Sequence, residues 1–150
     1  MLNALSAPVD RCLRGAGWTP SRRADPSEWL DQLSKEGYTV VPAARPILES
    51  LASLTIVPDE EDDQVFTPQP FDFCALDAGS GQRDLVQLWE TRLGQPLFPL
   101  GQAFGYMTLL VADDGRVLAG ETDTLHLIGK NIDEALEVMI IAKRAPTVIA

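Results

Sequence analysis

The order in which apolar patterns follow one another most constrains the fold of this chain. Helical spacing of apolar residues comes first, in segments over 7–16, from Asp25-Pro26 to Gly37, and from Pro42 to Leu51. Strand-like runs cluster later, over 97–100, 106–112, 116–119 and 124–128. Leading helices and clustered strands favour an α+β fold over the alternating order of a doubly wound parallel sheet.

Local signals define individual elements of this fold. Asp114-Gly115 predicts a hairpin turn, because glycine tolerates positive φ. Asn131 with Glu134 three residues later predicts the start of a final helix. The spacing of Leu85, Leu88, Trp89 and Leu93 predicts a further helix closed by Gly94, and Trp89 is expected in the core. The prediction is a single domain with a central, mostly antiparallel sheet and helices packed against it.

Two short strands, over 54–57 and 71–75, flank a segment that interrupts regular structure. This segment, residues 58–70, combines a run of acids with prolines, so we expect a flexible acidic loop. The domain is expected to span residues 1–143, with 144–150 as a tail.

The net charge of −10 limits the possible partners. Binding to nucleic acid or to an anionic membrane depends on cationic side chains, so neither is expected as a direct ligand. Residues 1–58 are neutral overall, and the entire surplus of acids lies after Pro58. A basic protein partner is therefore expected to dock on the part formed by residues 59–150.

Two groups of carboxylates are the candidate contact residues for such a partner. The first is a consecutive run, Asp59, Glu60, Glu61, Asp62 and Asp63. The second comes from the predicted hairpins and consists of Asp113, Asp114, Glu121 and Asp123. The run lacks the glycine and the alternating ligands of an EF-hand, so no metal site is expected.

The residues that usually carry catalysis are sparse. His126 is the single histidine, and no nucleophile motif accompanies it. Cys12 and Cys74 lie in apolar patterns and are expected as small core residues, whereas Trp18 is a candidate for exposure. No glycine-rich phosphate motif is complete, so no cofactor is expected and the chain is predicted not to be an enzyme.

Several ordered motifs resemble one family over residues 12–140. The opening part is Leu13-Arg-x-Ala-Gly-Trp-Thr-Pro-Ser-Arg-Arg23, followed by Trp29-x-x-x-Leu33-x-x-x-Gly37-Tyr and Pro42-Ala-Ala. The later part is Leu97-Phe-Pro-Leu-Gly101, Asp113-Asp-Gly-Arg-Val117 and Gly129-x-x-x-Asp133-Glu-Ala-Leu136. Together they resemble the third subfamily of the SUKH superfamily of immunity proteins.

This resemblance implies an α+β fold and a bacterial, cytoplasmic protein that binds and neutralises a polymorphic toxin. The toxins of such families are typically nucleases or nucleic-acid deaminases with basic surfaces. The resemblance supplies no catalytic residues. Residues 58–70 fall where the family pattern is short and variable.

Two alternatives remain open at this point. The wider superfamily resemblance also reaches intracellular regulatory or scaffold modules that bind other partners. A small hydrolase that uses His126 with Cys12 or Cys74 ranks last, because no motif supports it. The absence of a basic leader before the first apolar residues, and of a long apolar segment, favours a cytoplasmic location.

Overall fold

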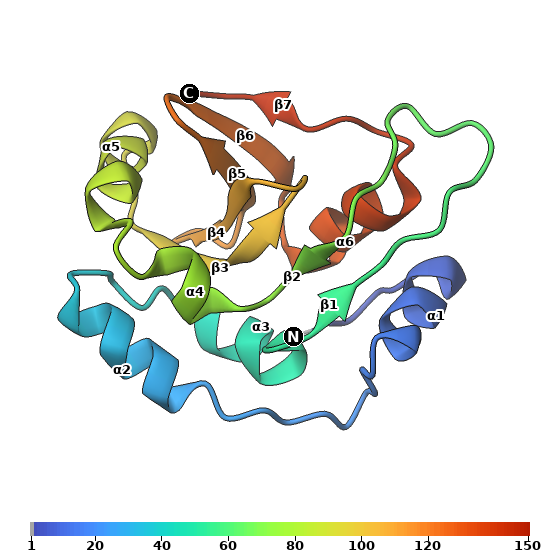
Figure 1. The fold of residues 1–150 in the computed structure, drawn as a ribbon, viewed down its shortest axis with the longest axis horizontal. Helices are drawn as coiled ribbons and strands as arrows, with labels where there is room; N and C mark the ends of the chain where they lie inside the picture. The colour runs from blue at the N-terminus through green and yellow to red at the C-terminus, as the bar shows by residue number, and fades with distance from the viewer. Residues whose placement is uncertain (1) are drawn as a thin grey trace.

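A five-stranded antiparallel sheet forms the centre of the computed structural model, which describes residues 2–150 (Figure 1). Its strands lie in chain order, and each is antiparallel to the next. They are β3 (Leu97–Ala103), β4 (Met107–Ala112), β5 (Val117–Glu121), β6 (Thr124–Gly129) and β7 (Thr147–Val148). Consecutive order follows from the short hairpin connections between β3 and β6.

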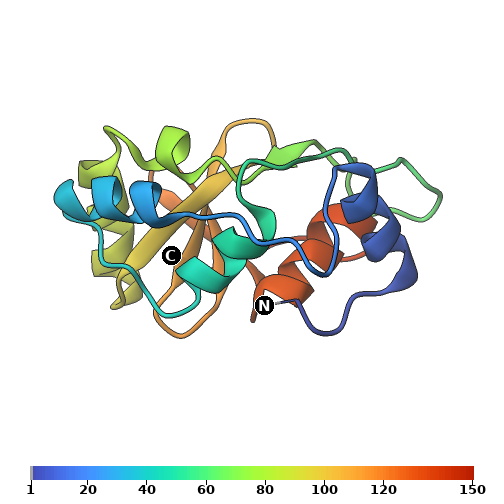
Figure 2. The same cartoon turned by 90° about the horizontal axis from the view of Figure 1, so that it is seen from below.

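Six helices within residues 2–150 surround this sheet. They are α1 (Ala7–Gly15), α2 (Ser27–Lys35), α3 (Ala44–Leu51), α4 (Ala75–Gly79), α5 (Arg83–Leu93) and α6 (Ile132–Ile141). Figures 1 and 2 place α5 and α6 on opposite sides of the sheet, with α1 beside α6 and α2 at the far end of the molecule. Helix α5 packs Trp89 over Gly120, and α6 brings Ala135 against Gly129.

A two-stranded ribbon, β1 (Thr55–Ile56) with β2 (Phe71–Asp72), lies against β3. The approach is so close that a Cβ built on Gly101 would lie 1.9 Å from the backbone oxygen of Asp72. Only glycine therefore fits at this position, where the pairing of β3 with β4 also shifts its register.

Burial explains why β3 and β4 are nearly continuous apolar runs. Both faces of these strands are covered, so every residue of Leu97–Gly101 is buried, as are Leu109–Ala112. Helix α3 also buries its predicted face, with Ala44, Ile47, Leu48 and Leu51 at 1% exposure or less. One hydrophobic core thus connects the helices with the sheet.

The predicted α+β class, the antiparallel hairpins and the final helix are confirmed. Gly115 adopts φ 91° in the turn between β4 and β5. At the start of α6, the backbone N–H of Glu134 donates to Asn131 Oδ1 at 2.9 Å.

Leu88 belongs to the spacing that predicted α5 but is 59% exposed, because Val86 and Trp89 form the inward face of this helix. Two local predictions were wrong. Trp18 is buried at 5% exposure, and the Arg14 guanidinium lies 5.6 Å from its ring centroid. The strand over 71–75 ends at Asp72, since Ala75 already begins α4.

The last residues also differ from the expected tail, because Thr147–Val148 forms β7 on the edge of the sheet. The two cysteines are partly rather than fully buried. None of the helices within residues 2–150 is long and apolar enough to cross a membrane.

Candidate partner-binding surface

The acidic loop, residues 58–70, is attached to the end of α6 by several contacts. Gln64 Nε2 donates to the backbone oxygen of Ile141 at 3.2 Å, and Val65 N donates to that of Ala142 at 2.8 Å. The ring of Phe66 packs edge-on against Phe104, with centroids 5.8 Å apart. These contacts fix where the loop projects from the domain, as the long loop on the right of Figure 1.

The acidic run lies at the outer part of this loop. Asp59 to Asp63 are all exposed. Among the described residues, none of their five carboxylates forms an ion pair or a side-chain hydrogen bond, although the backbone of Glu61 donates to Gln64. Their charges are therefore available to a partner.

A groove of about 340 Å³ lies beside the run, between α1, β1 and the end of α6. We call it the α1–loop groove. Asp59 and Glu61 line it on the loop side, and Ile140 and Ile141 on the α6 side. The wall formed by α1 and its C-terminal end consists of Pro8, Arg11, Cys12, Gly15 and Ala16.

The negative charge of Asp59 affects the ionisation of Cys12, which lines this groove. The thiol of Cys12 donates to the backbone oxygen of Val57 at 3.6 Å. Burial, together with the negative charge of Asp59, raises the pKa of that thiol. The groove therefore disfavours additional negative charge.

A second hollow, of about 360 Å³, borders the later part of the loop. Glu60, Glu61, Gln64, Val65 and Phe66 contribute to its lining. Glu61 therefore lines both this hollow and the α1–loop groove.

The structure separates the hairpin acids into two pairs. Asp113 and Asp114 lie in the turn between β4 and β5, whereas Glu121 and Asp123 lie at the other end of β5. The second pair is at the same end of the sheet as Phe104, which contacts the acidic loop. The acidic loop and Glu121 with Asp123 thus share one end of the sheet.

Asp114 is already engaged within its own turn. Its Oδ2 accepts from Gln95 Nε2 and from Arg116 Nε, both at 2.8 Å. Burial alone would raise the pKa of Asp114, but the hydrogen bond from Gln95 and the bonds and charge of Arg116 lower it. Asp113 is exposed.

Glu121 lies in a small polar group with Tyr106 and His126. Its Oε1 is 3.8 Å from His126 Nε2, a buried nitrogen that has no hydrogen-bond partner among the described residues. Tyr106 is 69% exposed, and the nearby Glu121 carboxylate raises its pKa. Asp123 is exposed, and its backbone oxygen accepts from Arg92 of α5.

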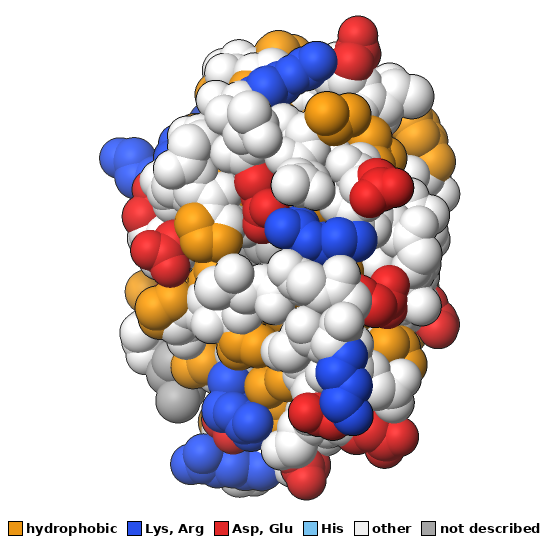
Figure 3. All heavy atoms as spheres, turned by 90° about the vertical axis from the view of Figure 1, so that its left-hand side faces the viewer, with side chains coloured by type: hydrophobic (Ala, Val, Ile, Leu, Met, Phe, Trp, Pro, Cys, Tyr) orange, Lys and Arg blue, Asp and Glu red, His pale blue; other side chains and the backbone are white. Residues whose placement is uncertain are grey.

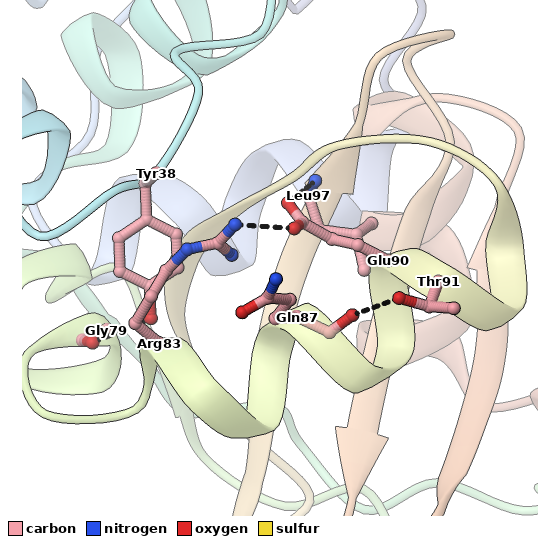
Figure 4. A network of polar contacts seen from close by, with 7 residues as sticks. All are labelled: Tyr38, Gly79, Arg83, Gln87, Glu90, Thr91 and Leu97. Atoms are coloured by element: carbon pink, nitrogen blue, oxygen red, sulfur yellow. Dashed lines mark hydrogen bonds and ion pairs between the residues drawn. The ribbon is translucent and has the colours of Figure 1, made fainter.

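Charges on the α5 side of the molecule are arranged differently (Figure 4). Arg83 Nη2 pairs with Glu90 Oε1 at 2.7 Å, and Glu90 Oε2 accepts from the Leu97 N–H at 2.8 Å. The Arg83 guanidinium also lies 5.1 Å from the ring centroid of Tyr38, whose hydroxyl donates to the Gly79 oxygen. This network joins α5 to β3 and to the segment after α2.

The outer surface on this side shows acidic, basic and apolar side chains interspersed (Figure 3). This view is of the left-hand side of Figure 1, where α2 and α5 lie. The acidic loop lies on the opposite side of the molecule (Figure 1).

The two thiols have no features of activated nucleophiles. Burial and the charges of Asp72 and Asp77 raise the pKa of Cys74, and the pKa of Cys12 is also raised. Catalytic cysteines need a lowered pKa. Within residues 2–150, neither thiol is hydrogen-bonded to His126, so the hydrolase alternative gains no support from the geometry.

Sequence reasoning missed the residues that shape the hollows. Gln64 and Phe66 anchor the loop, and Gly15 and Ala16 open the α1–loop groove. The paired small residues at the end of α1 were a visible signal. Their proximity to Asp59 and to the end of α6 depends on tertiary packing.

These features define a small α+β domain in which an exposed run of carboxylates lies beside a groove. The chain matches the family model described as SUKH-3 immunity protein over residues 5–141. Because this match covers most of the 150 residues, the chain belongs to the SUKH-3 immunity protein family. Searches of the curated proteins and of the solved structures found no match.

Proposed function

We propose that this protein binds a cognate toxin in the bacterial cytoplasm and neutralises it by covering its active site. The partner is a basic toxin, a nuclease or a nucleic-acid deaminase of a polymorphic toxin system. Membership of the immunity family supports the toxin as partner. Catalysis by this chain is not part of the proposal, and it needs no cofactor.

The observation that carries the proposal is the exposed acidic run on an anchored loop. Five unpaired carboxylates raise the negative potential on one side of the domain, which speeds the encounter with a basic surface. A toxin that binds nucleic acid presents cationic side chains around its active site. The same side chains would meet the acidic loop and block access to the substrate.

The two pairs of hairpin acids are proposed to contribute to partner binding to different extents. Glu121 and Asp123 extend the contact surface, since they lie at the end of the sheet that contacts the acidic loop. Asp113 and Asp114 lie at the opposite end and reach only a partner large enough to span the sheet. Asp114 contributes less, because its carboxylate is engaged in the turn.

Co-expression tests the proposal. The toxin gene encoded next to this protein is induced in bacteria with and without this chain, and survival is counted. We expect cells to survive only when the chain is present, and an inactive toxin serves as the control for expression burden. Equal killing in both cultures would contradict toxin immunity for that pair and favour a regulatory or scaffold role.

A further inference from the structure

We propose that the α1–loop groove receives a single cationic side chain of the partner, with the aliphatic stem along α6 and the charged group beside Asp59 and Glu61. This inference rests on the proposed function and adds an anchor point to it. An arginine or lysine has both an apolar stem and a cationic end, so it matches a groove with both kinds of wall.

The apolar part of the groove comes from the core elements that border it. Ile140 and Ile141 of α6 line one side, and Pro8 of α1 lines another. Gly15 and Ala16 leave this end of the groove wide, and a Cβ built on Gly15 meets no atom within 4 Å. The volume of about 340 Å³ leaves room for a long side chain.

The electrostatic part has two independent sources. Asp59 and Glu61 supply two carboxylates without ion pairs among the described residues. In addition, the groove is lined by the last turns of two helices, α1 at Gly15 and α6 at Ile141. The C-terminal end of a helix carries partial negative charge and favours cations.

One cation, Arg11, also lines the groove. It forms no ion pair within residues 2–150 and therefore offsets part of the negative potential. Arg11 therefore allows a test in which the direction of the change in binding is predicted. Removal of Arg11 must strengthen the binding of a cationic side chain and weaken that of an anionic one.

The experiment titrates the full chain with N-acetyl-arginine methylamide and N-acetyl-lysine methylamide while backbone amide signals are followed by NMR. The neutral analogue N-acetyl-citrulline methylamide is the control probe. We expect saturable shifts at Cys12, Gly15 and Val57 with the cationic probes only. Equal binding of the citrulline probe, or no shift at these residues, would overturn the proposal.

Charge variants locate the binding. The double variant Asp59→Asn/Glu61→Gln is expected to weaken it about tenfold, because two exposed carboxylates are lost. The control Asp77→Asn/Asp84→Asn removes the same charge from exposed positions on α4 and α5 and leaves the affinity unchanged. Arg11→Gln is expected to tighten binding about twofold to threefold. An equal loss in both double variants, or weaker binding with Arg11→Gln, contradicts the proposal.

A steric variant provides the second readout. Gly15→Trp fills the groove and should abolish the shifts, whereas Gln87→Trp on the outer side of α5 should retain them. Gly15→Ala verifies that the position tolerates a side chain, and it should raise the resistance to urea unfolding. Retained binding in Gly15→Trp would exclude the groove as the site.

The two proposals fail separately. If the groove does not bind the cationic probes while co-expression still protects cells, only the anchor is wrong. If the probes bind but the neighbouring toxin still kills, the groove remains and toxin immunity for that pair is contradicted.

Discussion

One pair of charged side chains on the α5 side, Arg83 and Glu90, is turned inward, whereas the carboxylates of the acidic loop are exposed and unpaired. Arg83 and Glu90 keep only 23% and 13% of their side-chain surface exposed and share a short ion pair. Asp59 to Asp63 project from a loop held at Gln64, Val65 and Phe66. The comparison indicates that similar carboxylates stabilise the fold in one region and remain free for a partner in the other.

The largest expected difference in stability is between the variants Glu90→Ala and Asp62→Ala, which each remove one carboxylate from one of the two regions. Loss of Glu90 leaves the Arg83 cation mostly buried without its partner and the Leu97 N–H without an acceptor. We expect the free energy of unfolding to fall by about 3 kcal/mol, near the lower bound for a broken buried pair. Asp62→Ala should change it by less than about 0.5 kcal/mol. Urea unfolding measures both, and equal effects would contradict the distinction.

Tyr38, which packs against Arg83 on the α5 side, is expected to make the stability of the fold depend on pH in the alkaline range. Burial, with the nearby Glu36, raises the pKa of Tyr38 from 10.0 to about 12 in the folded protein. The unfolded chain therefore ionises first, and stability falls as pH rises above 10. Between pH 10 and pH 12, ionisation of Tyr38 should lower the free energy of unfolding of the unsubstituted protein by up to about 2–3 kcal/mol.

The variant Tyr38→Phe should lack this pH-dependent loss of stability. At neutral pH its free energy of unfolding should be about 1 kcal/mol lower than that of the unsubstituted protein, because the hydrogen bond to the Gly79 oxygen is missing. Chemical unfolding between neutral pH and pH 11 should show the stability of the two proteins converge. Tyr106→Phe, at an exposed position, serves as the control and should leave neutral-pH stability unchanged. A constant gap between native protein and Tyr38→Phe would refute the assignment.

Substitution of Asp114 is expected to cause the smallest change in stability. Because its folded pKa is lowered, its contribution is present above pH 3.8 and is lost as pH falls further. Its side chain is 43% exposed, so Asp114→Asn should cost only about 0.5 kcal/mol at neutral pH. Thermal unfolding at neutral and acidic pH should show this difference disappear in acid. Asp113→Asn, at the exposed neighbouring position, serves as the control variant.

Local sequence signals predicted elements whose cause is local. The Asn131 cap and the Asp114-Gly115 turn depend on a few neighbouring residues, and both formed as expected. Strand β7 was missed, because its pairing with β6 depends on contacts far along the chain. The exposure of Leu88 could not be predicted, since apolar spacing alone does not identify which side of α5 faces the sheet.

The candidate surface was predictable only in part. The acidic run is visible as consecutive residues, and its charge limits the partners from sequence alone. The α1–loop groove joins α1, β1 and the end of α6, which are distant in sequence and come together only by packing. Whether the hairpin acids form one group or two likewise depends on strand register.

The association rate constant between this protein and the toxin encoded beside it tests the central claim most directly. Stopped-flow measurements at several salt concentrations would compare Glu60→Gln/Asp62→Asn with Asp77→Asn/Asp84→Asn, which have equal net charge. We predict that the loop variant associates about threefold to tenfold more slowly and with a weaker salt dependence, while the control stays close to the native rate. Equal rates for the two variants would contradict the claim that the acidic loop steers the partner.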